Sequence, residues 1–320
     1  HTFTDMGKLI DGNWVVKSII TSDSLGAYDR LPRTFLEYIS KDNKIFKPES
    51  GRYHLYISYA CPWATRTIIY RKLKKLEKHI SISVVHPSML DEGWIFDESF
   101  PGATKDHLYG SQYLREIYQR ADQNITTSVT VPILWDKETE TIVNNESSQI
   151  IRMFNSEFNE LTGNYDDYYP EQNRSDIDSL NDLIYETVNN GVYKSGFAKT
   201  QEAYDEAVTK LFETLNNLEA RLSSSRYLIG DNITEADLRL IPTLLRFDAV
   251  YVTHFKCNLR RIIDYKNLSR YVQDMLLIPA VRDTLDIEHI KQHYYFSHEQ
   301  LNPCRIIPKG PENIFKEAEQ

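Results

Sequence analysis

Cysteine is scarce in this chain, and the few that it has lie far apart. Cys61, Cys257 and Cys304 are the only three among 320 residues. A secreted domain held together by disulfides needs more cysteines at closer spacing, so we predict a protein of a reducing compartment, the cytoplasm. The chain also lacks any run of about eighteen apolar residues, and we therefore predict no transmembrane helix and no membrane partner.

An excess of basic residues is lacking as well. The formal net charge is −9 at pH 7, with 37 lysines and arginines against 46 aspartates and glutamates. Proteins that bind nucleic acids usually present a clustered basic face. We interpret the basic cluster at residues 71–78 as the solvated side of a helix, so nucleic acid is not expected as a partner.

Several familiar catalytic signatures are missing. The sequence has no glycine-rich phosphate loop, no Gly-x-Ser-x-Gly element and no dinucleotide-binding fingerprint. His289 and His293 lie four residues apart, with His298 close by, and could share one side of a helix. A metal site needs a further aligned ligand, and no acid or cysteine in this stretch is placed to serve. We therefore predict no bound metal.

What the chain does contain is a strand, a cysteine and a helix in immediate succession. Apolar and polar residues alternate from 53 to 58, a pattern that indicates a half-buried strand. Helical spacing of apolar residues follows over 62–78. Proline is well tolerated at the first position of a helix, and Pro62 occupies that position, so Cys61 is expected at the N-cap.

A cysteine at an N-cap is expected to be reactive. The amides at a helix start are unpaired, and together with the helix dipole they favour an anion, so we expect Cys61 to be a thiolate with a lowered pKa. Three residues on, where a two-cysteine redox motif has its second thiol, the chain has Ala64. A disulfide formed at Cys61 therefore needs an outside thiol to resolve it. The alternative is a buried structural cysteine.

The rest of the first half predicts a small α/β unit. A second strand is expected at 80–85, and a strand–helix–strand unit of this kind begins a parallel sheet. Residues 86–128 form a long insert with one short helical stretch at 110–120, and such inserts are usually functional. Two segments joined by a charged turn, 131–135 and 141–144, predict a β-hairpin.

Helical spacing resumes at Ser147 and dominates the second half. After a polar link at 164–174, further helices are predicted over 177–189, 203–222, 235–248 and 268–276. Thr234 and Asp237 form a capping signature before the third of these. The N-terminal residues have only patchy periodicity, and we expect an extended surface leader there. The predicted domains are 1–47, 48–163 and 164–320.

Several strings of the sequence, in this order, resemble one family. They are Arg52-Tyr-His-Leu-Tyr56, Cys61-Pro-Trp-Ala64, Gly93-Trp94, Thr130-Val-Pro-Ile-Leu-Trp-Asp136, Ile142-Val-Asn-Asn-Glu-Ser-Ser148, Asn190-Gly-Val-Tyr193 and Arg246-Phe-Asp-Ala-Val-Tyr251. Together they look like the xi class of glutathione transferases, the glutathionyl-hydroquinone reductases. The resemblance continues through 254–258 and 293–298. It implies a thioredoxin-like α/β domain followed by an all-helical glutathione-transferase domain, and a homodimer.

The resemblance also implies where glutathione, as a co-substrate, binds. It places the tripeptide over the helix that follows Cys61, with Trp94 lining the site. A cis peptide bond before Pro132 would leave the backbone of Val131 to pair with the tripeptide. From the residues alone, Pro132 also suits an edge strand, and a tryptophan is more often part of a core.

Glu146 and Ser147, at the start of a helix, are implied as partners of the γ-glutamyl ammonium and carboxylate. Simple capping by Asn145 and Ser147 is compatible with that role. The remaining implied contacts fall on the segment that leads to the cis bond: Ser128, Val129 and Thr130. Ser128 stands where relatives often have an arginine, and Thr65 stands where they often have a histidine.

Three of the 21 tyrosines acquire roles from the resemblance. Tyr193 is implied as proton donor or acceptor for the leaving aromatic, and Tyr251 as a hydrogen-bond donor to the Cys61 thiolate. Tyr294, or its neighbour Tyr295, would hold a substrate oxygen, because a phenol stays protonated at neutral pH.

The resulting hypothesis is an enzyme that reduces S-glutathionyl-hydroquinones through a mixed disulfide between Cys61 and glutathione, which a second glutathione then resolves. A broader omega-like thiol transferase or a dehydroascorbate reductase would use the same cysteine. The tyrosines favour an aromatic phenol over a small carbohydrate acid. A scaffold protein with a transferase fold and no turnover is the alternative of a different class.

Overall fold

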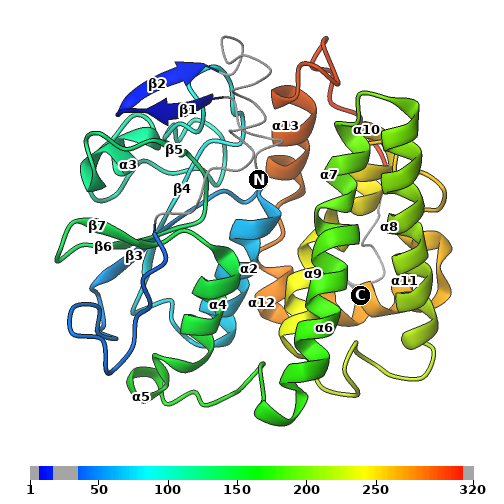
Figure 1. The fold of residues 1–320 in the computed structure, drawn as a ribbon, viewed down its shortest axis with the longest axis horizontal. Helices are drawn as coiled ribbons and strands as arrows, with labels where there is room; N and C mark the ends of the chain where they lie inside the picture. Colours follow the sequence, from blue (N-terminus) through cyan, green and yellow to red (C-terminus); the bar gives the residue numbers. More distant parts are fainter. Residues whose placement is uncertain (1–6, 17–34, 313–320) are drawn as a thin grey trace. The chain divides into compact units, whose positions relative to one another are not determined.

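The computed structural model describes residues 7–16 and 35–312. The chain divides into two units, His1–Asp166 and Asp167–Gln320, close to the predicted boundary after 163. The described part of the first unit mixes strands and helices, and that of the second is helical (Figure 1). No helix within the described ranges is long and apolar enough to cross a membrane.

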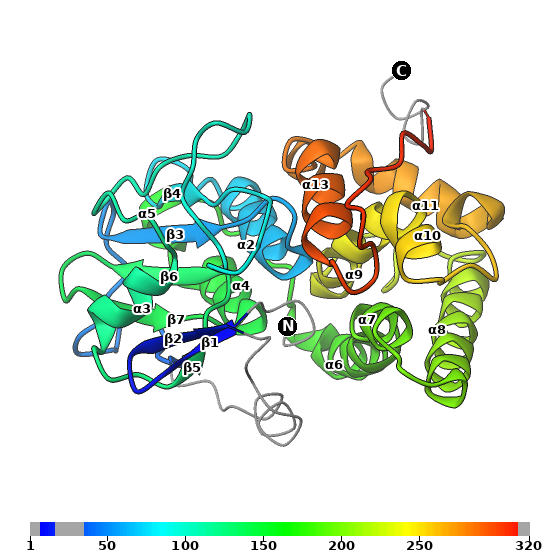
Figure 2. The same ribbon diagram turned by 90° about the horizontal axis from the view of Figure 1, so that it is seen from above.

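A four-stranded mixed sheet forms the centre of the first unit. Its strands are β3 (Tyr53–Ile57), β4 (Ser81–Val84), β6 (Ile133–Asp136) and β7 (Thr141–Asn144). Their order is β4-β3-β6-β7, as the view from above shows (Figure 2). β3 and β4 are parallel and are joined through α2 (Pro62–Leu73), whereas β6 is antiparallel to β3 and to β7. The predicted strand–helix–strand unit and the predicted hairpin are confirmed.

Strand β3 is buried along its whole length, so the expectation of a half-buried strand was wrong. Its polar side chains have partners inside the protein. His54 bonds through Nδ1 to Ser81 Oγ (2.6 Å) and through Nε2 to Ser83 Oγ (2.8 Å). The Tyr56 hydroxyl donates to Asp106 Oδ1 at 2.8 Å. The alternation of polar and apolar residues in β3 therefore does not indicate one buried face and one solvated face. Both faces of the strand are buried, and the polar side chains have hydrogen-bond partners.

Helix α2 ends at Leu73, before the expected end near Lys78. The chain turns at Lys75, whose φ of 59° cannot continue a right-handed helix. Two members of the basic cluster make hydrogen bonds within the protein, and one of them, Lys74, is buried. Arg71 Nε donates to Ile80 O at 2.7 Å, and Lys74, 1% exposed, donates through Nζ to the carbonyl of Asp166. The cluster is thus partly a set of tertiary contacts, contrary to expectation.

The N-terminal leader contains a β-hairpin that was not predicted. β1 (Gly7–Ile10) pairs with β2 (Asn13–Val16), and β1 also pairs with β5 (Thr127–Ser128), giving a sheet of order β2-β1-β5. Asp11 and Gly12 form its two-residue turn with φ values of 50° and 81°. Asp-Gly is a recognised hairpin signal, and the sequence showed it. Residues 35–47 of the predicted leader contain no helix or strand apart from a bridge of Leu36 to Asn144, and the predicted leader at 1–6 and 17–34 lies outside the described residues.

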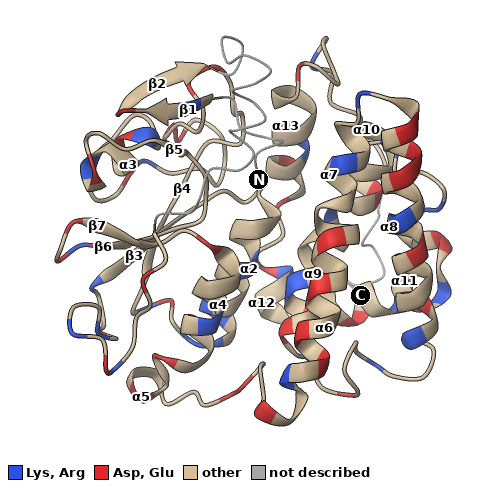
Figure 3. Cartoon of the chain, viewed as in Figure 1, with Lys and Arg blue, Asp and Glu red and all other residues tan. Residues whose placement is uncertain are grey.

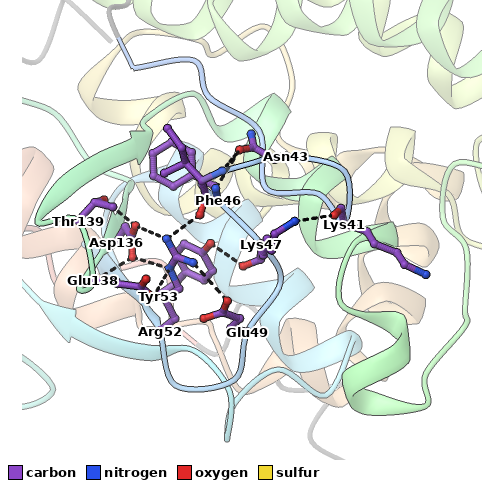
Figure 4. Close-up of polar contacts among 11 residues, drawn as sticks. Lys41, Asn43, Phe46, Lys47, Glu49, Arg52, Tyr53, Asp136, Glu138 and Thr139 are labelled. Atoms are coloured by element: carbon purple, nitrogen blue, oxygen red, sulfur yellow. Dashed lines mark hydrogen bonds and ion pairs between the residues drawn. The ribbon is translucent and has the colours of Figure 1, made fainter.

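Arg52, just before β3, ties the segment that precedes the sheet to strand β6. Its Nε and Nη2 donate to the two oxygens of Asp136, each at 2.9 Å, and Nη2 also donates to Ile45 O at 2.8 Å (Figure 4). Burial alone would raise the pKa of Asp136, but hydrogen bonds from Arg52 and Thr139 outweigh it and lower that pKa. This network closes the end of β3 that is remote from Cys61.

The first unit has one helix within the insert and two after strand β7. They are α3 (Arg115–Ala121), α4 (Ser147–Ser156) and α5 (Asn159–Thr162). The short helix of the insert was expected to begin at residue 110. It begins at Arg115, five residues later. Helix α4 begins at Ser147 as predicted and packs against α2.

The second unit is a set of packed helices. They are α6 (Arg174–Ile184), α7 (Gly191–Gly196), α8 (Gln201–Arg221), α9 (Glu235–Arg246), α10 (Val252–His254), α11 (Lys266–Leu276), α12 (Pro279–Arg282) and α13 (Ile287–Ser297), with 3-10 turns η3 (Glu171–Asn173) and η6 (Ile262–Asp264). The predicted capping box is confirmed, because Thr234 and Asp237 each bond to the other's backbone at the start of α9. Helices α6 and α8 each contain more acidic than basic residues (Figure 3).

Candidate active site

Cys61 lies at the N-cap of α2, as predicted. Its φ and ψ are −76° and 120°, Pro62 takes the first helical position, and Sγ accepts a hydrogen bond from the Ala64 amide at 3.5 Å. The side chain is 9% exposed. An N–H donor and the positive end of a helix both stabilise negative charge on sulfur. The position is therefore suited to a nucleophilic thiolate.

The segment before Pro132 lies next to that sulfur. The Val131–Pro132 peptide bond is cis, as the sequence led us to expect, and Val131 O is 3.8 Å from Cys61 Sγ. Just upstream, the Tyr118 hydroxyl donates to Thr130 O at 2.8 Å and accepts from Thr130 N at 3.3 Å. A backbone held in this way beside the thiol can receive an extended peptide.

The start of helix α4 differs in detail from the capping considered for it. Glu146 is the N-cap residue, and its Oε1 accepts from both the amide and the hydroxyl of Ser148, at 3.4 and 3.3 Å. Ser147 is fully buried, and its Oγ accepts from Arg66 Nη1 at 3.4 Å. A carboxylate, a hydroxyl and a buried guanidinium therefore meet at one helix start.

Arg66 was missed in the sequence. It is 2% exposed and lies on α2, where its guanidinium is also 4.8 Å from the ring centre of Trp63. Helical spacing placed Arg66 one turn from Trp63, but a basic residue on a helix is usually solvated, and nothing local indicated burial. Only the packing of α2 against α4 brings it to Ser147.

Trp94 and Ser128 lie outside the four-stranded sheet of the first unit. Trp94 is 5% exposed, follows Gly93 in a turn, and accepts at its carbonyl from Leu114 N at 3.0 Å. Ser128 is buried in β5, and its register partner on β1 is Lys8. Val129 is buried as well, between Ser128 and Thr130.

The three tyrosines implied by the resemblance meet in the second unit. The Tyr294 hydroxyl on α13 lies 2.5 Å from that of Tyr193 on α7 and 2.8 Å from that of Tyr251. We expected three separate contacts, whereas the structure joins the phenols in one hydrogen-bonded triad with Tyr294 at its centre. Burial, reinforced by Tyr294, raises the pKa of Tyr251 well above its ordinary value. Tyr251 is therefore held as a neutral phenol at neutral pH, and the three hydroxyls form one hydrogen-bonded chain.

Tyr295, the alternative to Tyr294, points elsewhere. Its hydroxyl donates to Ala249 O at 2.9 Å, and burial raises its pKa to about 12. Its proton is engaged by the backbone of the segment Phe247–Tyr251, which is a π-helical turn, η5. Tyr295 therefore buttresses the turn that carries Tyr251.

Two π-helical turns adjoin the triad, and the sequence did not reveal either. η4 (Tyr185–Asn189) runs into α7, which bears Tyr193, and η5 ends at Tyr251. Such turns insert one extra residue into a helix and occur often at functional sites. Hydrophobic spacing has no signature for one extra residue, so residues 185–189 were expected as ordinary helix, and the helix expected over 235–248 included only the first two residues of η5.

The histidines considered for a metal are buried beside the triad. His254 Nε2 bonds to His298 Nδ1 at 3.0 Å, and burial lowers the pKa of His254 to about 4. His289 and His293 are also buried, on α13. Within 7–16 and 35–312, no group of three or more histidine, cysteine, aspartate or glutamate side chains is arranged to hold a metal ion.

Comparison with known proteins identifies the family. The model of the glutathione S-transferase N-terminal domain matches residues 60–157, and that of the C-terminal domain matches residues 201–274. The chain is 51% identical to the glutathionyl-hydroquinone reductase YqjG of Escherichia coli (strain K12), over 96% of this chain and 95% of that protein. The chain belongs to the xi class of glutathione transferases.

Other relatives of this xi-class transferase agree in fold. The glutathione-bound structure of YqjG superposes with a TM-score of 0.89 at 50% identity, covering 97% of each chain. A xi-class transferase from Natrialba magadii gives 0.93 at 45% identity, covering 98% of this chain and 96% of its own. A protein of Schizosaccharomyces pombe called glutathione S-transferase omega-like 2 is 50% identical over 89% of this chain and 94% of its length.

The matched regions of this xi-class transferase divide its candidate site unevenly. Cys61 and all the residues implied in glutathione binding fall inside the N-terminal match at 60–157. Of the triad, Tyr251 falls inside the C-terminal match, whereas Tyr193 and Tyr294 fall outside both. Two of the three phenols, Tyr193 and Tyr294, are thus not covered by the general transferase domains.

Proposed function

We propose that this xi-class transferase reduces S-glutathionyl-hydroquinones with glutathione as reductant and Cys61 as nucleophile. The observation that carries the proposal is the Cys61 sulfur at the start of α2, within 3.5 Å of the Ala64 amide and with no second cysteine one turn on. The names of the relatives above support the substrate class, and a bound glutathione in the YqjG structure supports the co-substrate.

The reaction then runs in two thiol exchanges. The Cys61 thiolate attacks the sulfur that joins glutathione to the aromatic ring, and the carbon–sulfur bond breaks with its electron pair going to the ring carbon. That carbon takes a proton, which we assign to Tyr193 of the triad, and the hydroquinone leaves. A glutathione thiolate next attacks the mixed disulfide, which releases oxidised glutathione and restores Cys61 as a thiolate.

Each binding residue has a role in this scheme. Val131 pairs with the tripeptide backbone, Glu146 and Ser147 bind the ends of its γ-glutamyl group, and Trp94 lines the site, with Ser128, Val129 and Thr130 adjoining. Tyr251 donates to the Cys61 thiolate, and Tyr294 holds a ring oxygen. Two successive exchanges at one sulfur require ping-pong kinetics.

The test replaces the nucleophile and uses an exposed cysteine as the control. We expect Cys61→Ala to abolish turnover of a glutathionylated hydroquinone while glutathione binding persists, and Cys304→Ser, at an exposed site, to leave turnover unchanged. Mass spectrometry of the wild type after one turnover without free glutathione should show one glutathione disulfide at Cys61. Substantial turnover by Cys61→Ala would refute the role.

An omega-like thiol transferase is the second candidate, and the name of the Schizosaccharomyces pombe relative favours it. Assays of a glutathionylated hydroquinone beside dehydroascorbate separate the two, because the triad suits a phenol. A scaffold without turnover would be indicated by a Cys61 that resists alkylation at neutral pH. We further propose a cytoplasmic homodimer, which sedimentation and cell fractionation can test.

A further inference from the structure

The N-terminal hairpin β1–β2 contacts two parts of the proposed glutathione site. On one side, β1 pairs with β5, with Lys8 opposite Ser128 and Leu9 opposite Thr127. Strand β5 leads directly into the segment ending at Val131. The turn of the hairpin is fastened as well, since Gly12 N donates to Ile125 O at 2.8 Å. The hairpin thus belongs structurally to the insert between β4 and β6.

On the other strand, Trp14 holds the turn that presents Trp94. Its Nε1 donates to Asp91 O at 2.9 Å, and the turn itself closes by a bond from Gly93 N to Leu90 O at 2.8 Å. The indole fits against two glycines. A Cβ added at Gly93 would lie 3.0 Å from the Cη2 atom of Trp14, and one added at Gly7 would lie 2.9 Å from its Cζ2.

Arg115 covers the remaining side of this turn. Its guanidinium is 5.2 Å from the ring centre of Trp14, and its Nη1 contacts Glu92 at the carbonyl (3.2 Å) and at the carboxylate (2.7 Å). The next residue back, Leu114, donates its amide to the carbonyl of Trp94. Residues 90–94 therefore contact the side chains of Trp14 and Arg115, which are distant from them in the sequence.

The backbone around Trp94 has no regular ladder to orient it. Apart from isolated bridges, residues 86–112 contain no helix or strand, so the direction of each side chain depends on tertiary contacts. A side chain that contacts a ligand must be held within about 0.5 Å of its productive position to contribute fully. The contacts of Trp14 reach from outside the insert into the turn next to Trp94.

We propose that Trp14 is a positioning residue for glutathione binding, which fixes the turn at 90–93 and thereby the orientation of Trp94. The proposal rests on the proposed function, because it assumes that Trp94 lines the glutathione site. On this proposal, the N-terminal hairpin contributes to glutathione binding by positioning Trp94. Trp14 itself touches neither the nucleophile nor the reacting atoms.

The experiment compares Trp14→Phe and Trp14→Leu with the wild type and with Tyr53→Phe. Tyr53 is a matched control, because its hydroxyl also donates to a backbone carbonyl, that of Lys47 at 2.6 Å, but at the end of β3 remote from Cys61. The measurements are Kd for glutathione by titration calorimetry, KM for glutathione, kcat at saturating glutathione, and the thermal midpoint.

We expect Trp14→Leu to raise Kd and KM for glutathione roughly tenfold, since loss of orientation by a fraction of an ångström has effects of this size or larger. The kcat at saturating glutathione should change little. Trp14→Phe, which keeps a ring but loses the bond to Asp91, should give a smaller rise. Tyr53→Phe should lower the thermal midpoint and leave Kd unchanged.

Each outcome is decisive for one of the two proposals. Failure of the folded wild type to bind glutathione overturns the proposed function. If the wild type binds and Trp14→Leu binds equally well, the positioning role is overturned while the function stands. A rise in Kd as large in Tyr53→Phe would likewise overturn it, by showing that Trp14 acts through stability alone. If Trp14→Leu does not fold, Trp14→Phe and Arg115→Met provide the same comparison.

Discussion

Two buried cysteines of this protein have different surroundings, and the contrast shows what makes a thiol reactive. Cys61 accepts a hydrogen bond from the Ala64 amide at the start of α2. Cys257 is fully buried, and its thiol can donate to Val192 O at 4.0 Å and to Phe255 O at 3.8 Å, with the Ser195 side chain as a further hydrogen-bond partner. Burial raises the pKa of Cys257 to about 12.

Both sulfurs lie near a backbone carbonyl, Val131 O in the case of Cys61, so what separates the two buried thiols is the amide donor at the start of α2. Carbonyls repel a thiolate, whereas N–H groups at a helix start attract it. The difference arises from local chain direction: Cys61 precedes a helix and faces its amides, while Cys257 follows the short helix α10. Other pairs of side chains in the molecule can be compared in the same way, by asking which hydrogen-bond or ion-pair partners each side chain has.

The largest expected effect is in thiol alkylation. With a pKa near 12, only about one Cys257 in 10⁵ is ionised at pH 7, since each pH unit changes the ratio tenfold. We expect iodoacetamide to label Cys61 and the exposed Cys304 in the native protein and to leave Cys257 unlabelled, as peptide mass mapping would show. Denaturation should expose all three, and native labelling of Cys257 at the rate of Cys61 would break the comparison.

The next largest effect is on stability, at the buried ion pair of Arg52 and Asp136. Arg52→Met leaves the fully buried Asp136 carboxylate without its bidentate partner, and we expect the free energy of unfolding to fall by about 3–5 kcal/mol. Urea unfolding measures this. The exposed pair of Lys210 and Glu206 is the control, and Lys210→Met should cost under about 0.5 kcal/mol. Equal losses would contradict the expectation.

The adjacent residues Tyr294 and Tyr295 extend the comparison of buried groups from stability to activity. Tyr294→Phe removes the hydroxyl that bonds to both Tyr193 and Tyr251, and we expect kcat to fall roughly 10²-fold, the scale of a proton-transfer contribution. Tyr295→Phe removes bonds to Ala249 O and Thr253 but none to the triad, and it should cost about 1 kcal/mol of stability with kcat almost unchanged. Steady-state kinetics with a glutathionylated hydroquinone would show it, and similar kcat values for the two variants would exclude a special role for Tyr294.

The most gradual effect is a pH dependence of stability from His54. Burial lowers its pKa to about 3, against about 6.5 in an unfolded chain. Above pH 6.5 the ring is neutral in both states. As pH falls below 6.5 the unfolded chain takes up a proton that the folded chain refuses, so stability falls, by at most about 1.4 kcal/mol per pH unit, until pH 3.

Urea unfolding between pH 7 and 4 tests this. His54→Gln should be less stable than the wild type at pH 7, because it disturbs the bonds to Ser81 and Ser83, and should lose less stability on acidification. An unchanged slope would assign the acid dependence to other groups, such as His254, whose pKa is also lowered by burial.

Much of the framework followed from the sequence because the signals are local. The N-cap at Cys61, the hairpin of β6 and β7, the start of α4 at Ser147 and the capping box at Thr234 each depend on residues a few positions apart. The burial of β3 and the hydrogen bonds of Arg71 and Lys74 were misjudged. Polar side chains are normally solvated, and the partners that bury these lie on other elements.

The sequence by itself determined the chemistry at one point, a cysteine held at the start of a helix with no second thiol one turn on, because neighbouring residues set both features. Tertiary structure decided which side chains surround that chemistry. Arg66 reaches Ser147, Trp14 reaches the turn before Trp94, and three phenols from separate helical segments meet at Tyr294. Contacts between residues far apart in the chain have no periodicity, and only the packing of the elements creates them.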